Sequence, residues 1–316
     1  NSDIFIATDM LKKYQEFCHG GKKLRGALIQ LGYELTDKNK KDILEASTSI
    51  EIIHSFLLMH DDIEDQDETR RGKPTIHKQY AKNHSAHYGL SMGINTGDLG
   101  HDLGMEVLLN SKLPSQNKIN AAIYLTQLLQ RVVYGQGLDV TYEQMENITE
   151  ENVMQVHLHK TAIYTISGPL IIGAILGGFN KNSLEMINKF GEPVGIAFQL
   201  RDDELGLFST EETLGKPIGS DIREGKNTLL RVKAMEFATK KDREFLNYAY
   251  GNPNISKKDV KMIQDITVNT GALDYSKKLS KSLVEQGKKI IPAITKNKDY
   301  QETLISMADF MISRNS

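Results

Sequence analysis

The sequence has few of the residues that mark a disulfide-rich or nucleic-acid-binding protein. Its 316 residues include one cysteine, Cys18, and no tryptophan. A single thiol excludes an internal disulfide and fits a reducing compartment. An excess of one charge is also missing, since 39 Lys and Arg stand against 41 Asp and Glu, for a formal net charge of −2. We therefore expect no nucleic-acid partner, because such a surface needs clustered positive charge.

Long apolar runs are missing as well. No uninterrupted run reaches the roughly 20 residues that span a bilayer. The N-terminal residues show no basic segment followed by an apolar one, as a secretion signal would. We therefore expect a cytoplasmic protein without stable membrane insertion. Its 39% hydrophobic and 25% charged residues are typical of a globular chain.

Strand signals are rare, because Val, Ile and Thr follow helical rather than alternating patterns. Thr239 to Asp242 and Ser256 to Asp259 have the spacing of capping boxes, which start helices. Pro169 and Pro193 lie inside apolar helical stretches, where proline kinks or ends a helix. We predict an all-α protein with a single domain over residues 1–316.

The strongest chemical signal follows the mainly apolar run 52–59, which contains no Gly or Pro and predicts a buried helix. Asp61, Asp62 and Asp65 stand where this run ends. Positions 61 and 65 lie one helical turn apart on one face, so both carboxylates can share a cation. Oxygen ligands without Cys or His favour magnesium over zinc.

Two arginines, Arg70 and Arg71, follow this cluster. Guanidinium groups hold phosphate oxygens in a forked geometry, so acids followed by arginines predict binding of a magnesium-bound phosphate. The alternative is a solvated helix end with scattered salt bridges. A second Asp pair, Asp202 and Asp203, also ends an apolar helix-like stretch. Two such pairs facing each other would form a multi-metal site for a diphosphate.

Two further segments extend the pattern: Gly20-Gly-Lys-Lys-Leu-Arg25 and Gly215-Lys-Pro-Ile-Gly-Ser-Asp-Ile-Arg-Glu-Gly-Lys226. In this order, the motifs resemble those of trans-isoprenyl diphosphate synthases, the family of farnesyl and geranylgeranyl diphosphate synthases. The resemblance implies a bundle of antiparallel helices around a deep central cavity, and a homodimer. It also implies a further helix ahead of Gly20, so the chain is expected to be trimmed at its N-terminus.

The resemblance assigns roles to individual residues. The metal ligands would hold magnesium, three ions with substrate bound: Asp61, Asp65 and Asp202. The residues expected to take part in catalysis are Asp61, Asp62, Asp65, Lys160, Asp202 and Asp203. The isopentenyl diphosphate ligands would be Lys22, Arg25, His54 and Arg71. The allylic diphosphate ligands would be Arg70, Lys160, Thr161, Gln199, Lys216 and Lys226.

Some of these assignments have ordinary alternatives. Lys22 and Arg25 could be solvated basic residues in a flexible turn. A lone histidine in an apolar helix is more often a hydrogen-bonded core residue, but His54 lies two helical turns before Asp61 on nearly the same face. Lys160 would be a solvated helical lysine if the other motifs were absent.

The implied reaction joins isopentenyl diphosphate to an allylic diphosphate (dimethylallyl, geranyl or farnesyl). Magnesium would neutralise the allylic diphosphate and make it a good leaving group. The double bond of isopentenyl diphosphate would attack the allylic cation, and proton loss would give a product five carbons longer. In the family, the released diphosphate is thought to accept that proton.

Product length would depend on what blocks the cavity. Phe56 lies five residues before Asp61, about one and a half turns below the metals. The first motif also lacks the two-residue insertion of many bacterial farnesyl synthases, and this combination resembles archaeal-type geranylgeranyl synthases. We predict a twenty-carbon product with Phe56 as the floor. Farnesyl diphosphate is the close alternative, a longer chain is possible, and Phe56 could also be an ordinary core residue.

The second Asp motif departs from the family pattern at Gly206, where many members have Asp. This departure leaves open one alternative of another class, a non-catalytic partner subunit of a heteromeric synthase, because such subunits typically lose one Asp motif. A class I terpene cyclase would carry an Asn/Ser/Glu triad in place of the second Asp pair. It would also not need Lys22, Arg25 or His54.

Three other groups of residues predict structural roles. Gly93 and Gly97, four apart, indicate close helix packing. Asp139 resembles a family residue that supports the diphosphate site without touching the substrate. His157 and His159 point to different faces of a helix, so we expect no metal site made by this pair.

Overall fold

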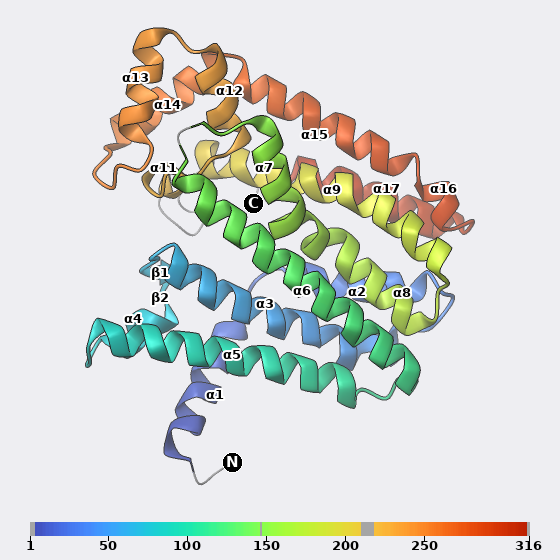
Figure 1. The fold of residues 1–316 in the computed structure, drawn as a ribbon. Coiled ribbons are helices and arrows are strands. Elements are labelled where there is room, and N and C mark those ends of the chain that lie inside the picture. The colour runs from blue at the N-terminus through green and yellow to red at the C-terminus, as the bar shows by residue number, and fades with distance from the viewer. Residues whose placement is uncertain (1–3, 146, 210–217, 315–316) are drawn as a thin grey trace. The chain divides into compact units, whose positions relative to one another are not determined.

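The structure, a computed structural model, describes residues 4–145, 147–209 and 218–314 (Figure 1). The chain forms two compact units. The first unit is residues 1–124 with 172–179, and the second unit is residues 125–171 with 180–316. Helices make up nearly all the regular structure of both, so the predicted all-α class is confirmed. The single domain predicted for residues 1–316 stays a prediction.

The first unit consists of helices and a short hairpin. Its elements are α1 (Phe5–Cys18), α2 (Leu24–Glu34), η1 (Lys40–Ile43), α3 (Leu44–Glu64), β1 (Thr69–Arg70), β2 (Lys73–Pro74), α4 (Ile76–Ala81) and α5 (Ala86–Asn110). Helices α3 and α5 lie side by side (Figure 1). The C-terminal end of α3 therefore carries the first Asp motif beside a long, well-packed neighbour.

Glycines on α5 allow this close packing. A Cβ atom at Gly97 would lie 2.6 Å from the His60 ring, and one at Gly104 would lie 2.5 Å from Cγ1 of Ile53. At Gly93 it would lie 2.9 Å from Cδ1 of Ile63. The close packing predicted at Gly93 and Gly97 is confirmed, since no side chain fits there without displacing a neighbour.

The hairpin β1–β2 pairs Thr69 with Pro74 and Arg70 with Lys73. Its turn residues, Arg71 and Gly72, both have positive φ, at 53° and 73°. Two left-handed residues are the signature of the tightest hairpin turns. The turn therefore holds the two arginines just after the end of α3.

The second unit consists of helices only, among the residues described. Two helices contain residues of both units: α6 (Ser115–Glu143) and α8 (Gly168–Gly177). The others are α7 (Glu150–Val156), the π-helix η2 (His157–Ser167), α9 (Lys181–Phe208), α11 (Ser220–Arg223), α12 (Leu229–Phe237), α13 (Lys240–Ala249), α14 (Lys257–Asn269), α15 (Ala272–Lys288), α16 (Ile291–Ile294) and α17 (Lys298–Ser313).

Helix α9 packs against η2 and α15. A Cβ atom at Gly195 would lie 2.6 Å from the carbonyl oxygen of Ala162, and one at Gly191 would lie 2.6 Å from Cα of Ser167. Two consecutive turns of α9 therefore approach the backbone of η2. Pro193 lies between these glycines, and α9 continues beyond it to Phe208, so the helix does not end at this proline.

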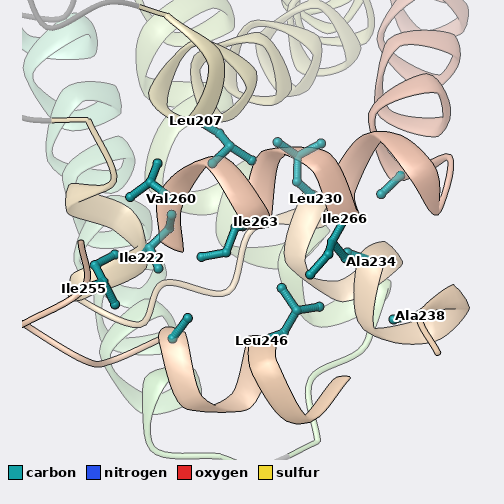
Figure 2. Close-up of a cluster of buried hydrophobic side chains, with 12 residues drawn as sticks. Leu207, Ile222, Leu230, Ala234, Ala238, Leu246, Ile255, Val260, Ile263 and Ile266 are labelled. Atoms are coloured by element: carbon teal, nitrogen blue, oxygen red, sulfur yellow. The ribbon is translucent and has the colours of Figure 1, made fainter. Parts of the chain in front are cut away.

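A hydrophobic cluster joins the end of α9 to α11–α14 (Figure 2). Leu207, Ile222, Leu230 and Ile263 are buried in it, from α9, α11, α12 and α14 in turn. Burying each side chain stabilises the fold by roughly 1.5–3 kcal/mol. The cluster thus fixes α11, and with it Asp221, next to the second Asp motif.

The two predicted helix starts are observed. At α14, the Ser256 side chain accepts from the backbone N–H of Asp259, and the Asp259 side chain accepts from the backbone N–H of Ser256. This is a complete capping box. At α13, the Thr239 side chain accepts from the backbone N–H of Asp242.

The segment Glu150–Gly177 is long and apolar enough, by length and composition, to cross a membrane. Of its most apolar window, 83% is buried inside the protein. Burial of this extent is typical of a core helix in a globular fold.

Candidate active site

The first Asp motif forms the C-terminal end of α3. Asp61 and Asp62 lie in its last turn, and the backbone N–H of Asp65, the C-cap, donates to the Asp61 carbonyl at 2.8 Å. The C-terminal end of a helix carries partial negative charge, which disfavours carboxylates there. The partial charge of the helix end and the charge of the carboxylates are thus both negative, and this end of α3 needs positive charge beside it.

Arg70 supplies one positive charge. Its Nε donates to Oδ1 of Asp62, and its Nη2 lies 3.5 Å from Oδ2 of both Asp61 and Asp67. Asp62 is only 1% exposed, and burial raises its pKa to about 7 against the opposing effect of Arg70. Arg70 was predicted to bind the allylic diphosphate; in this structure it pairs with the acids of the first motif.

The donor set at this helix end fits magnesium. Its side-chain donors are carboxylate oxygens, as hard cations prefer. Oδ2 of Asp62 is buried and has no hydrogen-bond partner among the described residues, so these residues compensate the negative charge only in part. In the part of the chain that the structure describes, no three His, Cys, Asp or Glu side chains form a preassembled metal site. Asp61 and Asp65 as ligands stay a prediction.

A glycine turn receives the second arginine of the hairpin. Nη1 of Arg71 donates to the carbonyl oxygen of His19 at 3.1 Å. Gly20 and Gly21 both have positive φ, and a Cβ atom at Gly21 would lie 3.0 Å from Nη2 of Arg71. Only glycine combines this backbone with so close a guanidinium. The Gly-Gly pair therefore brings Arg71 to the N-terminal side of α2.

His54 lies on α3 among positive side chains. Burial lowers its pKa well below the usual range, and Arg25, Arg71 and Arg70 lower it further. His54 is therefore neutral at physiological pH. Three of the four predicted isopentenyl diphosphate ligands, His54, Arg25 and Arg71, therefore lie close enough in the first unit for both arginines to act on the histidine. Lys22, the fourth, is exposed before α2.

Phe56 packs against two histidine rings. Its ring centroid lies 4.9 Å from that of His60 on α3 and 5.5 Å from that of His101 on α5, both edge to face. Such aromatic pairs contribute roughly 0.5–1.5 kcal/mol beyond area burial. Phe56 is thus held in place one and a half turns before Asp61, as its proposed role as a floor requires.

The second Asp motif separates into an exposed and a buried carboxylate. The Asp202 side chain is 47% exposed. Asp203 is 8% exposed, and its Oδ1 accepts from Nε2 of Gln199 at 2.8 Å while its Oδ2 lies 3.2 Å from Nε2 of His157. Burial raises the pKa of Asp203, opposed by His157 and Gln199. Asp203 therefore supports the motif from inside, and Asp202 is the accessible carboxylate.

Gly206 is explained by Asp221. A Cβ atom at position 206 would lie 2.7 Å from Oδ2 of Asp221, which comes from α11. The Asp221 carboxylate thus lies where a side chain of residue 206 would begin. An aspartate at 206 would meet both steric overlap and a like charge. Through Asp221, this chain has a carboxylate beside the motif despite the departure from the family pattern.

Lys160 and Thr161 lie in the π-helix η2. Nζ of Lys160 donates to Oδ2 of Asp139 at 2.6 Å. A Cβ atom at Gly135, one turn before Asp139 on α6, would lie 2.3 Å from the backbone nitrogen of Lys160. Asp139 thus holds the lysine, in agreement with the supporting role implied for it.

The two lysines of the glycine-rich segment are Lys216 and Lys226. Nζ of Lys226 lies 3.4 Å from Oε2 of Glu224, and the backbone N–H of Lys226 donates to the Asp221 carbonyl at 2.9 Å. Lys216 lies outside the described residues. Their roles toward the allylic diphosphate stay predictions.

Sequence reasoning missed two partners of the second motif, His157 and Asp221. The signal for His157 was weak: it stands one helical turn before Lys160, but nothing local links it to Asp203. Asp221 belongs to the recognised glycine-rich segment, where the lysines drew the assignment. Neither pairing follows from spacing, because each joins two separate helices.

Comparison with known proteins agrees with these features. Residues 8–267 match the family model of polyprenyl synthetase. The chain is 33% identical to the geranylgeranyl diphosphate synthase of Sulfolobus acidocaldarius, covering 98% of this chain and 93% of that protein. It is 35% identical to the short chain isoprenyl diphosphate synthase of Methanothermobacter thermautotrophicus, covering 99% and 92%.

A solved structure extends the likeness to the fold. The geranylgeranyl pyrophosphate synthase of Corynebacterium glutamicum, complexed with isoprenyl diphosphate and magnesium, superposes with a TM-score of 0.91 at 30% identity. The match covers 97% of this chain and 91% of that one. The predicted all-α fold of isoprenoid synthase type and the predicted prenyltransferase activity are confirmed. The chain belongs to the polyprenyl synthetase family.

Proposed function

We propose that the protein condenses isopentenyl diphosphate with an allylic diphosphate, head to tail, and releases geranylgeranyl diphosphate. The observation that carries this proposal is the end of α3, where carboxylates gather at the negative end of a helix next to Arg70. Acids placed at this end suit a cationic ligand rather than fold stability. The names of the similar proteins support a twenty-carbon product.

Asp61, Asp65 and Asp202 are the proposed magnesium ligands, with three ions in the substrate complex. Bound magnesium would supply the positive charge that stabilises the departing diphosphate. Arg70 already compensates Asp61 and Asp62, so it limits the repulsion among these acids before any cation binds. Asp203, held by His157 and Gln199, orients the end of α9 that carries Asp202.

The group of His54, Arg25 and Arg71 in the first unit is the proposed site for the isopentenyl diphosphate group. Arg25 and Arg71 provide fixed charge, and the N-terminus of α2 adds the positive end of a helix dipole. Neutral His54 can donate one hydrogen bond while its other ring nitrogen stays unprotonated. Lys160, held by Asp139, is proposed to bind the allylic diphosphate, together with Thr161, Gln199, Lys216 and Lys226.

Assembly and location remain proposals too. We propose a homodimer, supported by apolar side chains of α5 that are exposed in the single chain: Leu90, Ile94 and Leu109 at 39%, 45% and 43%. Leu90 and Ile94 lie one helical turn apart on α5, and adjacent exposed apolar side chains are typical of a protein interface. Light scattering after size exclusion tests this, and an Ile94→Glu variant should weaken the dimer. A cytoplasmic location stays a prediction.

Product analysis tests the function directly. The purified chain is incubated with magnesium, isopentenyl diphosphate and each allylic starter in turn, and the products are separated by chain length. A dominant twenty-carbon product supports the proposal. A fifteen-carbon or longer product keeps the enzyme but overturns the assigned length. Absence of elongation with every starter would favour the partner-subunit alternative.

Phe56 provides the sharper test of product length. Phe56→Ala removes the ring that His60 and His101 hold, so we expect products longer than twenty carbons. Phe56→Tyr keeps the ring and serves as the matched control. Equal product lengths in Phe56→Ala and the parent protein would reject the floor.

A further inference from the structure

A guanidinium group lies on the accessible carboxylate of the second Asp motif. Nη2 of Arg314, directly after α17, lies 2.6 Å from Oδ1 of Asp202. The Arg314 side chain is 7% exposed, while that of Asp202 is 47% exposed. A buried arginine thus meets an exposed aspartate, whereas in most surface ion pairs both partners are solvated.

The rest of the surroundings hold Arg314 in this place. Its guanidinium carbon lies 4.1 Å from the ring centroid of Phe198, one turn before Asp202. The Arg314 carbonyl accepts from Nε and Nη2 of Arg201, at 3.1 and 3.0 Å. Arg201 is in turn fixed by Glu204, which accepts from its Nη1 at 3.1 Å. The backbone and the side chain of residue 314 are therefore both bound to α9.

This arrangement leaves part of the guanidinium unsatisfied. Nε of Arg314 is buried with no hydrogen-bond partner in the described chain. A buried donor without a partner costs free energy, so the pair is not arranged for stability alone. The buried charge is compensated by the Asp202 contact, by the Phe198 ring and by the Phe198 carbonyl oxygen, which accepts from Nη2 of Arg314 at 3.5 Å.

We infer that Arg314 is the resident counter-ion of Asp202, and that a divalent cation binds this carboxylate only by displacing the guanidinium. The inference rests on the proposed role of Asp202 as a magnesium ligand. A positive charge held 2.6 Å from this carboxylate opposes the approach of a second one. Arg314 is thus a positioning residue that sets how tightly the second motif binds a free metal ion.

Manganese binding to the full chain without substrate tests the competition. Free Mn²⁺ is measured by electron paramagnetic resonance in the parent protein and in Arg314→Gln, Arg314→Lys and Asp202→Asn. We expect Arg314→Gln to bind Mn²⁺ about fivefold more tightly, the effect of removing an ion pair worth about 1 kcal/mol. Arg314→Lys keeps the charge and should stay close to the parent. The double variant D202N/R314Q should lose the gain.

A matched control comes from another ion pair that binds α17. Lys288 pairs with Asp309 on α17, so Lys288→Gln also breaks an ion pair of α17 without touching Asp202. Its Mn²⁺ affinity should equal that of the parent. If Arg314→Gln binds Mn²⁺ no more tightly than the parent, or if Lys288→Gln gives the same gain, the inference is wrong.

A second measurement needs no variant that could misfold. Phenylglyoxal modifies accessible arginines, and mass spectrometry gives the extent at each position. We expect Mg²⁺ to increase the modification of Arg314, because displacement from Asp202 exposes its guanidinium group. Arg231, whose Nη1 donates to the Gly225 carbonyl at 2.6 Å, is the control, and its modification should not change. Unchanged modification of Arg314 across a magnesium titration overturns the inference.

Asp202→Asn separates the proposed metal role of Asp202 from the counter-ion role of Arg314. If this variant binds Mn²⁺ as the parent does, Asp202 is not a metal ligand, and both the proposed role and this inference fail. If Asp202→Asn weakens binding while Arg314→Gln does not strengthen it, the metal role stands and the counter-ion role of Arg314 fails alone.

Discussion

The two Asp motifs solve the same electrostatic problem with partners at very different distances along the chain. In the first unit, Arg70 follows Asp62 by 8 positions and reaches it through a tight hairpin. In the second unit, the guanidinium on Asp202 comes from a residue 112 positions away. The first motif is therefore assembled locally, whereas the second depends on the packing of several helices. Damage to the fold should affect the second motif first.

The largest expected effect comes from removing a proposed metal ligand in either unit. Asp61→Asn and Asp202→Asn should each lower kcat by about a hundredfold to a thousandfold, because each removes a charge that the transition state uses. Steady-state kinetics with saturating magnesium measures this. Asp67→Asn is the control, since Asp67 contacts Arg70 but is not a proposed ligand; a loss as large as that of Asp61→Asn would contradict the assignment.

Gly206 tests the packing around the second motif. Gly206→Asp should destabilise the protein by about 2–3 kcal/mol, because its side chain begins 2.7 Å from Oδ2 of Asp221 and brings a second carboxylate, with a like charge, against the first. Gly206→Ala should cost less than about 1 kcal/mol, since the end of the Asp221 side chain can move and alanine favours the helix. Urea unfolding compares the two.

The double variant G206D/D221N isolates the charge. We expect it to recover part of the stability that Gly206→Asp loses, because the like-charge repulsion is gone. A double variant as unstable as Gly206→Asp would mean that overlap alone accounts for the loss.

Acid should weaken the first unit through His54. Its pKa is lowered in the folded state, so the unfolded chain binds the proton first. The contribution of His54 to stability is present above pH about 6.5 and is lost as the pH falls below it, by at most about 1.4 kcal/mol per pH unit. Urea unfolding at several pH values measures this slope. His54→Gln should flatten the slope between pH about 6.5 and 5; an equal slope in both proteins would contradict a lowered pKa.

The smallest effect is expected at Asp139. Asp139→Asn weakens the hold on Lys160 without removing the lysine, so we expect KM for the allylic diphosphate to rise about fivefold, with kcat nearly constant. Asp102→Asn is a control on α5, where the carboxylate is 84% exposed and lies 3.1 Å from Nδ1 of His101. A change in kcat alone would argue against a positioning role for Asp139.

The sequence was informative where partners are neighbours. The acid cluster at the end of α3, the arginines of the hairpin and the glycines of α5 all follow from spacing along one helix or one turn. The Gly20–Gly21 segment was recognised from its sequence as well, and the structure adds that its turn accommodates Arg71. Local geometry restricts such groups to few arrangements, which is why they could be predicted.

The pairings between helices could not be predicted. Nothing in the residues around His157 indicates that Asp203 lies beside it, and nothing near Arg314 indicates Asp202. These contacts depend on the packing of α9 against η2 and α17. That packing results from many small contacts between buried side chains acting together. The π-helical form of η2 was missed as well, because a wider helical turn has no residue signature of its own.

The π-helix has a consequence for which changes in chain length this protein can accept. Hydrogen bonds in η2 span five residues instead of four, so a turn of this segment contains more residues than a turn of α-helix. Deleting one residue from it would allow a return to ordinary α-helix, with little disturbance of the flanking helices. Only the side chains within η2, around the deletion, would change direction. Lys160 and Thr161 would then face a different direction. Such a deletion would leave a folded protein whose lysine no longer points to its substrate, so selection against it would act on chemistry rather than on stability.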